Sequence, residues 1–321
     1  MKLKQIQDLF VKEAIKADPR GIAAVEQDLL KRKQDYEALS EGKKEFFDME
    51  SLTNPYYDSR ILYGDENTEV KTIMVGIDME TPELLLAKEL INSGKKIDLV
   101  IAHHPEGYAY STFHSVIGMQ TDILHKQGIP VNITEKLISS RIREVKRSVM
   151  PQNNERVSDA AKLLDIPFMT AHSVADNHVA SFLQKEIEAS APRYLRDIIA
   201  FLNKQPEYRH SASIGIAPTV LVGADDSRCG KIFVDMTGGT EGPVGSLEKL
   251  AGAGIGTIIC MHLSPKAVKE AEKQNLNIIL AGHISSDNLG LNLLFDKLEK
   301  KLGAVDFVES SGFRRFKRTC L

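Results

Sequence analysis

From about residue 70 onward, short apolar segments alternate with amphipathic stretches of ten or so residues. The short segments are apolar throughout rather than at every second position, so strands formed from them must be covered on both faces. Strands of this kind separated by helices predict a mainly parallel sheet. The expected strands are 71–77, 98–102, 129–133, 166–170, 212–222, 231–236, 257–261 and 276–281. The expected helices are 82–93, 116–127, 153–164, 178–190, 245–253, 265–274 and 288–301.

Two pairs of segments repeat the same pattern. Residues 73–105 and 232–265 each contain a strand, an aspartate, a helix and a second strand. Residues 160–176 and 271–287 each contain a helix, a short strand, a histidine and an aspartate four residues later. We therefore predict an α/β protein of two similar halves, with mainly parallel sheets flanked by helices. The ends of their strands, where α/β proteins usually carry their chemistry, should face each other.

The first 65 residues differ from the rest. Apolar positions in 4–16 and 21–47 recur at helical spacing, and Asp18-Pro19 and Gly21 separate the two helices. Residues 54–64 are expected to form a loop. The predicted organisation is a helical N-terminal extension at 1–65, a first α/β half at 66–205 and a second at 206–321, with possible interleaving of the halves. The core is expected to fold without the extension.

Composition narrows the functional classes. The net charge of −3 gives no general reason to expect nucleic-acid binding. No apolar run reaches the 18 or so residues of a membrane span, and the amphipathic N-terminus does not resemble a signal peptide. Three widely spaced cysteines favour a reducing compartment, so we expect a cytoplasmic protein. We interpret the basic stretches 136–147 and 314–318 as solvated surface. Alternatively, they form a surface that attracts anions.

His103 and His104 form the first candidate site, because they directly follow an expected strand and precede Pro105. Neighbouring residues on an extended chain point to opposite sides, so the two imidazoles can face two different metals. Alternatively, one histidine ligates a metal while the other supports it, or one is a core residue and the other is exposed.

Two further strand ends carry a histidine followed by an aspartate, namely His172 with Asp176 and His283 with Asp287. Each aspartate can instead be a helix cap or first-turn residue, with Ser285 or Ser286 as a cap of the last helix. His172 can be a ligand, a supporting group or a proton shuttle. Taken together, the His and Asp donors favour two divalent ions of Zn, Fe, Mn or Ni, bridged by Asp176 or Asp287. Water bound to such ions can act as the hydrolytic nucleophile.

Five segments in this order resemble the Nif-three-like family, also called the NGG-interacting-factor-three or GTP cyclohydrolase I type 2 family. The resemblance spans roughly residues 70 to 303. It implies two similar α/β domains, a ring-shaped homohexamer and a dinuclear metal site. The segments are 77–89, 98–105, 171–176, 234–242 and 281–294, and the implied ligands are His103, His104, Asp176, His283 and Asp287.

The chain departs from the family pattern at several places. Asp287 stands where the family usually has Glu, and the segment AHSVAD replaces Ala-His-Thr-Asn-Leu-Asp. The family places the turn 237–242 near the metal pocket, which makes Glu241 a candidate acid or base beside Glu106 and His172. Alternatively, this turn binds phosphate through its backbone amides, or it is only a tight connection between a strand and a helix. His262 is a further residue that can join the site.

Two functions fit these features. The first is a metal-dependent hydrolase acting on a small polar substrate, of nucleotide or heterocyclic kind if the resemblance extends to chemistry. The alternative is a metal-containing adaptor in a ring assembly without turnover. Nucleic-acid binding inside a basic ring is disfavoured by the net charge.

Overall fold

A computed structural model describes residues 1–318. Cys320 lies outside these residues, whereas Cys229 and Cys260 are buried free thiols. Within the described part of the chain, no helix combines the length and the apolar character that crossing a bilayer requires.

The first sheet has the order β1-β4-β3-β2-β9. Three of its four pairings, β2 with β3, β2 with β9 and β3 with β4, are parallel, and β1 pairs with β4 in antiparallel orientation. The residues of β2, β3 and β4 are buried along their whole length, as expected of strands covered on both faces. The bounds are β1 Ile61–Tyr63, β2 Thr72–Gly76, β3 Leu99–Ala102, β4 Phe168–Thr170 and β9 Asp306–Glu309.

The second sheet has the order β5-β8-β7-β6. Strands β6, β7 and β8 are parallel, and β5 is an antiparallel edge strand beside β8. The bounds are β5 Thr219–Val222, β6 Lys231–Asp235, β7 Ile255–Cys260 and β8 Asn277–Leu280. The two sheets confirm the predicted α/β class with mainly parallel strands.

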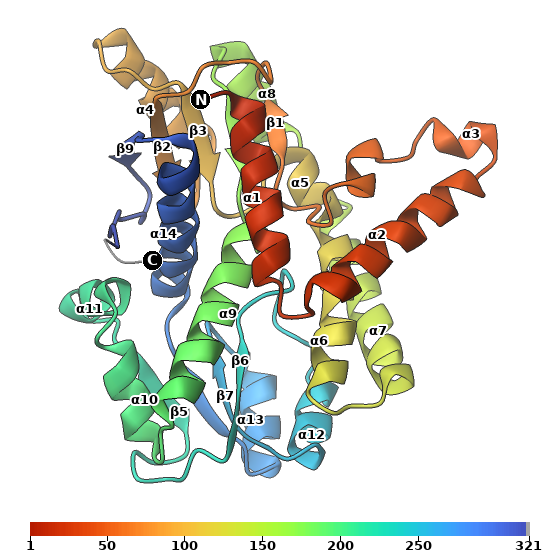
Figure 1. Ribbon diagram of the computed structural model, residues 1–321, viewed down its shortest axis with the longest axis vertical. Coiled ribbons are helices and arrows are strands. Elements are labelled where there is room, and N and C mark those ends of the chain that lie inside the picture. Colours follow the sequence, from red (N-terminus) through yellow and green to blue (C-terminus); the bar gives the residue numbers. More distant parts are fainter. Residues whose placement is uncertain (319–321) are drawn as a thin grey trace.

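Helices cover both sheets, and two long ones, α9 and α14, pack against each other between them (Figure 1). Each follows the corresponding strand of its sheet, β4 for α9 and β8 for α14. The helical elements are α1 Leu3–Ala17, α2 Ile22–Glu37, α3 Glu41–Lys44, η1 Met49–Leu52, α4 Thr81–Asn92, α5 Gly107–Thr112, η2 Phe113–Met119, α6 Gln120–Lys126, α7 Val131–Val149, α8 Arg156–Leu164, α9 Ser173–Ser190, α10 Leu195–Leu202, α11 Pro206–Ser213, α12 Gly245–Gly252, α13 Pro265–Lys273 and α14 His283–Leu302.

The N-terminal helices α1 and α2 behave differently. The apolar face of α1, with Leu3, Ile6 and Phe10, is buried in the core beneath the first sheet and contacts α9 and α14. Helix α2 has one buried residue, Val25, and projects with α3 away from the body as an arm (Figure 1). The extension thus contains one core helix and one projecting arm.

One expected strand is wrong, and another is shorter than expected. Residues 129–133 lead into helix α7, because Thr134, Ile138, Val145 and Val149 recur at helical spacing and form its buried face. Residues 206–213, which include the start of the expected strand 212–222, form helix α11. The strand there shortens to β5, which begins after Gly215 with a φ of +88°.

Two strands were not expected. Strand β1 lies in the predicted loop 54–64, and β9 follows the last helix. Both pair at the edges of the first sheet, so that sheet draws strands from near each end of the described chain. The predicted bounds of the extension and the two halves remain a prediction.

Candidate metal centre

His103 and His104 directly follow β3, and in each ring one nitrogen, Nδ1, is engaged in a hydrogen bond. The Nδ1 atom of His103 donates to the Ala171 carbonyl at 3.0 Å, and that of His104 donates to Asp78 at 2.6 Å. Because a carbonyl or carboxylate can only accept, the proton of the neutral ring lies on Nδ1, and Nε2 carries the lone pair. Both rings therefore present Nε2 as a metal donor, oriented by a partner behind the ring.

Asp176 lies in the first turn of α9, and Asp287 lies just after the first turn of α14. Helix α9 begins at Ser173 and α14 at His283, so Asp176 is not the N-cap, and Ser285 and Ser286 lie inside α14 rather than capping it. The two helices approach closely at Gly290, where an added Cβ would lie 2.5 Å from the Ala175 carbonyl oxygen. This close approach brings the two carboxylates to the same place.

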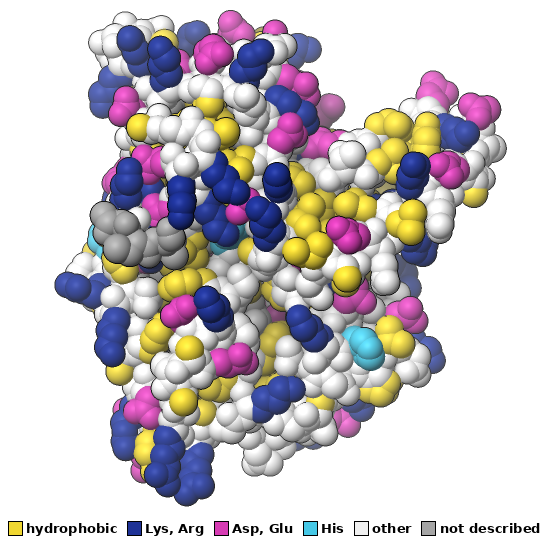
Figure 2. Space-filling model, viewed as in Figure 1, with side chains coloured by type: hydrophobic (Ala, Val, Ile, Leu, Met, Phe, Trp, Pro, Cys, Tyr) yellow, Lys and Arg dark blue, Asp and Glu magenta, His cyan; other side chains and the backbone are white. Residues whose placement is uncertain are grey.

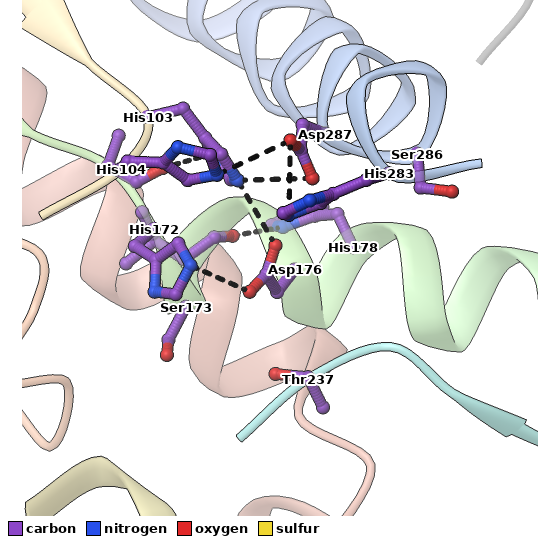
Figure 3. A network of polar contacts seen from close by, with 12 residues as sticks. His103, His104, His172, Ser173, Asp176, His178, Thr237, His283, Ser286 and Asp287 are labelled. Atoms are coloured by element: carbon purple, nitrogen blue, oxygen red, sulfur yellow. Dashed lines mark hydrogen bonds and ion pairs between the residues drawn. The ribbon is translucent and has the colours of Figure 1, made fainter. Parts of the chain in front are cut away.

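His172 and His283 occupy equivalent positions just before their aspartates. His172 is buried, and its Nδ1 contacts Asp58 at 2.8 Å. The side chain of His283 is 39% exposed, and its ring centroid lies 5.1 Å from that of His104. Figure 3 shows the rings of His103, His104 and His283 and both carboxylates converging on one space.

The donor atoms are spaced as the ligands of a cation are. His103 Nε2 lies 3.4 Å from Asp287 Oδ1 and 3.5 Å from Asp176 Oδ1. Asp287 Oδ2 lies 3.6 Å from His104 Nε2 and 3.7 Å from His283 Nε2. These separations are too long for hydrogen bonds, but a tetrahedron with bonds of about 2.0–2.2 Å has edges of roughly 3.3–3.6 Å. Asp287 thus faces two positions, one with each oxygen.

Several of these atoms are buried without a hydrogen-bond partner among the described residues. They are His103 Nε2, Asp176 Oδ1 and both carboxylate oxygens of Asp287. Buried polar atoms are rarely left unpaired, and four in one cluster indicate a missing binding partner. Two overlapping sets, His103 with His172 and Asp176, and His103 with His104 and Asp287, have one donor atom per residue within 4.8 Å of the others. These residues fit a divalent metal ion.

The two carboxylates have opposite pKa shifts. Burial raises the pKa of Asp176 to about 6 despite the nearby His172 and His103. Burial also acts on Asp287, but the surrounding His103 and His283 outweigh it and lower its pKa. Asp287 therefore carries a buried negative charge that a cation at either of its oxygens would neutralise.

Burial lowers the pKa of His104 to about 4, with a further lowering by the neighbouring His103. The pKa of His283 is lowered by the same cause. Both rings are thus neutral at physiological pH, which is the form that binds metal.

The site opens into a cavity of about 450 Å³. His104, His172, His262 and His283 lie along its wall, and the mouth carries an exposed ion pair between Arg156 and Glu80 at 2.6 Å. Glu106 also lines this cavity, and burial together with Glu80 raises its pKa to about 7.

A second, narrow cavity of about 70 Å³ adjoins the site from the side of the second sheet. Glu241 lines it with Asp176 and His283, but its carboxylate accepts hydrogen bonds from the Ser264 hydroxyl at 2.9 Å and the Ser264 amide at 3.1 Å. Glu241 therefore already braces the start of α13.

The structure also shows contacts that the sequence did not indicate. Asp58 lies in the predicted loop, and no spacing or motif distinguishes it. The basic stretch 314–318 is paired: Arg315 contacts Asp296 at 2.5 Å, and Arg318 contacts Glu207 at 2.7 Å. Arg315 and Arg318 are therefore held against the body, whereas the side chains of Arg314 and Lys317 remain largely exposed.

The fold was compared with those of known proteins. Neither a model of a known protein family nor a curated protein sequence matches the chain. Among solved structures, the crystal structure of a NIF3 superfamily protein from Sphaerobacter thermophilus is 29% identical, with a TM-score of 0.68 over 80% of this chain and 91% of that one.

Two more distant structures are also similar. Reduced HcgD from Methanocaldococcus jannaschii is 16% identical with a TM-score of 0.48, over 84% of this chain and 94% of that one. A Bacillus cereus protein related to NIF3 is 13% identical with a TM-score of 0.41, over 78% and 89%. The assignment rests on the Sphaerobacter protein, which is similar over 80% of this chain. The chain belongs to the NIF3 superfamily.

Proposed function

We propose that the protein is a metal-dependent hydrolase with two divalent ions of Zn, Fe, Mn or Ni per chain. The proposed substrate is a small polar molecule of nucleotide or heterocyclic kind. The observation that carries the proposal is the cluster of buried, unpaired donor atoms at the base of a cavity. The proposed ligands are His103, His104, Asp176, His283 and Asp287.

The position of the cluster supports catalysis over a purely structural role. Structural zinc sites are closed by four protein ligands, whereas catalytic sites keep a free position. Here His103 and Asp287 are fully buried, but His104 and His283 line the open cavity, with side chains 25% and 39% exposed. A cavity of about 450 Å³ is within the range of small-molecule sites.

The side chains that line the cavity favour a substrate with a flat ring. Tyr110 and Phe113 lie on it with their rings stacked, 5.4 Å between centroids and 12° between planes. Such a surface offers apolar contact to a flat heterocycle. Glu106, near the double histidine, can hold or release a proton around neutral pH because burial raises its pKa to about 7. A divalent ion bound in the site would lower the pKa of water and polarise the bond under attack.

The first test is elemental analysis of protein purified without added metal. Two equivalents per chain, falling below one in His104→Ala with the fold retained, are expected. His262→Ala is the matched control, because His262 lines the same cavity but is not one of the five proposed ligands. Full metal content in the His104 variant would contradict the proposed site. The activity itself is tested by assaying metal-loaded wild-type protein for hydrolysis of nucleotides and heterocyclic amides.

One observation favours a role as an adaptor in a ring assembly without turnover. The arm exposes Leu30 (57%) and Phe46 (85%), and apolar side chains gather on it and where it joins the body (Figure 2). An adaptor would keep its metals but show no turnover with any hydrolase substrate. We also propose a homohexamer located in the cytoplasm, and light scattering would give the mass of the assembly directly.

A further inference from the structure

We propose that the cavity at the metal site takes an uncharged nitrogen heterocycle without phosphate, namely a nucleobase or nucleoside rather than a nucleotide. The ring would lie against Tyr110, and its N–H groups would donate to Glu106 and Asn154. Carboxyl groups at the mouth would disfavour a phosphate. This inference rests on the proposed function, because it names the substrate class of the same site.

One part of the cavity wall comes from the start of α5. Glu106 directly precedes this helix, and Tyr110 follows it by four residues, a spacing that places two side chains on one face of a helix. Both line the cavity, and Phe113 stacks against Tyr110 with 12° between the ring planes. A flat ring that lies along this aromatic surface would therefore have a carboxyl group within one helical turn of it.

A second part of the wall comes from the segment that connects α7 to α8, and it presents hydrogen-bond acceptors. Asn154 Oδ1 is buried and has no hydrogen-bond partner among the described residues. Gln152 donates its side-chain amide to the Ser148 carbonyl at 3.0 Å, so its oxygen remains to accept from a ligand. A buried acceptor without a donor indicates a missing partner. Ring N–H and exocyclic amino groups of a heterocycle are donors of this kind.

The two parts of the wall are held close to each other. Gly107, the first residue of α5, has a φ of +55°, and a Cβ added there would collide with the Ser158 hydroxyl on α8. Because α5 and α8 touch at this point, the aromatic surface and the segment before α8 keep a fixed separation. A site formed in advance loses less conformational entropy when its ligand binds.

The charged groups at the mouth disfavour a phosphate. Among the described residues that line this cavity, Arg156 is the sole lysine or arginine, and its guanidinium is paired with Glu80 at 2.6 Å. Phosphates are usually bound by Arg or Lys side chains that are available to them. A phosphate at this mouth would instead meet the carboxyl groups of Glu80 and Glu106, which repel it when they are ionised.

The first experiment measures the binding of the common ribonucleosides and their 5′-monophosphates by isothermal titration calorimetry. It uses the full chain with the metal that it retains on purification. At least one nucleoside should bind with a dissociation constant below about 1 mM, and its monophosphate should bind about tenfold more weakly. Binding of no nucleoside would overturn the inference. Tighter binding of the monophosphate would also overturn it, and would favour phosphate binding at Gly239 and Thr240, which line the same cavity.

Variants assign the binding to particular side chains. Tyr110→Ala should weaken nucleoside binding about tenfold, because the ring loses its stacking surface. Tyr108→Ala is the matched control, since Tyr108 lies on the same helix but lines a different cavity. Asn154→Ala should weaken binding about fivefold through the lost acceptor. Circular dichroism checks that each variant is folded, and equal affinities of the Tyr110 and Tyr108 variants would contradict the proposed position of the ring.

A charge variant tests the exclusion of phosphate separately. Glu80→Gln should strengthen binding of the monophosphate and leave the affinity for the nucleoside unchanged, because the mouth loses a negative charge and Arg156 loses its ionic partner. Glu155→Gln is the matched control, since Glu155 is exposed and lines the other cavity. An unchanged ratio of the two affinities in Glu80→Gln would show that the mouth does not select against phosphate.

Metal content measured on the same samples separates this inference from the proposed function. Two equivalents of metal without nucleoside binding would overturn the substrate class and leave the dinuclear site standing. Nucleoside binding by a chain that neither retains nor takes up metal would support the substrate class and contradict the hydrolase.

Discussion

The two sheets end in the same arrangement of strands and helices but supply different donors. In the first sheet, His103 and His104 follow β3, and His172 and Asp176 follow β4. In the second, Met261 occupies the place that corresponds to His103, so β7 is followed by one histidine, His262. The first sheet therefore contributes four donors to the candidate site, and the second contributes two, both from the start of α14.

The aspartates that follow the first strand of each pattern differ in the same way. Asp78 accepts a hydrogen bond from His104 at 2.6 Å and orients a donor ring. Asp235 makes no hydrogen bond to His262 within residues 1–318, and His262 instead lies with its ring centroid 5.0 Å from that of His283. A repeated strand and helix pattern thus preserves positions, while the residues at those positions decide which half holds metal.

The largest expected effect concerns the covering of the first sheet. Helix α1 packs in the core of the first sheet, and β1 is one of its edge strands. Deleting residues 1–65 should therefore abolish cooperative unfolding, with a loss of more than about 5 kcal/mol in the free energy of unfolding. This reverses the expectation from sequence that the core folds without the extension. Urea denaturation followed by circular dichroism measures it.

Point variants separate the core helix from the arm. Phe10→Ala should cost about 3–5 kcal/mol because Phe10 is buried, whereas Leu30→Ala on the arm should change stability by less than about 0.5 kcal/mol. Equal effects would mean that the arm belongs to the core.

The next effect concerns the bridge between the halves. Asp287→Asn should lower metal content from two equivalents to below one, because each oxygen of Asp287 faces a different position. Asp235→Asn, at an aspartate of the second sheet outside both groups of metal-competent side chains, should leave metal content unchanged. Elemental analysis after dialysis measures both, and equal losses would show that the halves contribute alike.

A smaller effect is expected where α9 crosses α14. Gly290→Ala would place a methyl group 2.5 Å from the Ala175 carbonyl oxygen, so the helices must move apart, at a cost of about 1–3 kcal/mol. Metal affinity should fall as well, since Asp176 and Asp287 separate. Gly252→Ala, with nothing within 4 Å of the added Cβ, should be neutral or stabilising. Thermal unfolding distinguishes them, and unaltered stability of the Gly290 variant would argue against a close crossing.

The smallest effect depends on pH. Burial and the neighbouring Glu241 raise the pKa of Asp235 to about 7. The folded state therefore binds this proton more tightly than the unfolded chain does, and stability is lost as the pH rises from about 4 through about 7.

Asp235→Asn should accordingly be more stable than wild type by about 1–2 kcal/mol at pH 8 and similar to it near pH 4. Asp78→Asn should give no gain at pH 8, because it replaces the carboxylate that accepts from His104 by a neutral amide, which is a weaker acceptor. Urea denaturation of metal-free protein at both pH values measures the difference, and a gain independent of pH would rule out this cause.

Much of the fold could be predicted because it follows from local periodicity. The buried strands β2, β3, β6, β7 and β8 and the helices between them were expected from uniform apolar segments and amphipathic stretches. The failures have tertiary causes. Residues 129–133 are apolar enough for a strand but continue into the buried face of α7, and β1 and β9 are short edge strands that form only because a neighbour offers hydrogen bonds.

By itself, the sequence determined the α/β class, the strand ends at which donors occur and the chemical type of those donors, since each depends on spacing along the chain. Only the tertiary structure decided which donors meet. The close crossing at Gly290 brings Asp176 to Asp287, and Asp58 reaches His172 from 114 residues away along the chain. Such contacts leave no periodic signal, because they depend on how helices pack rather than on the order of residues within them.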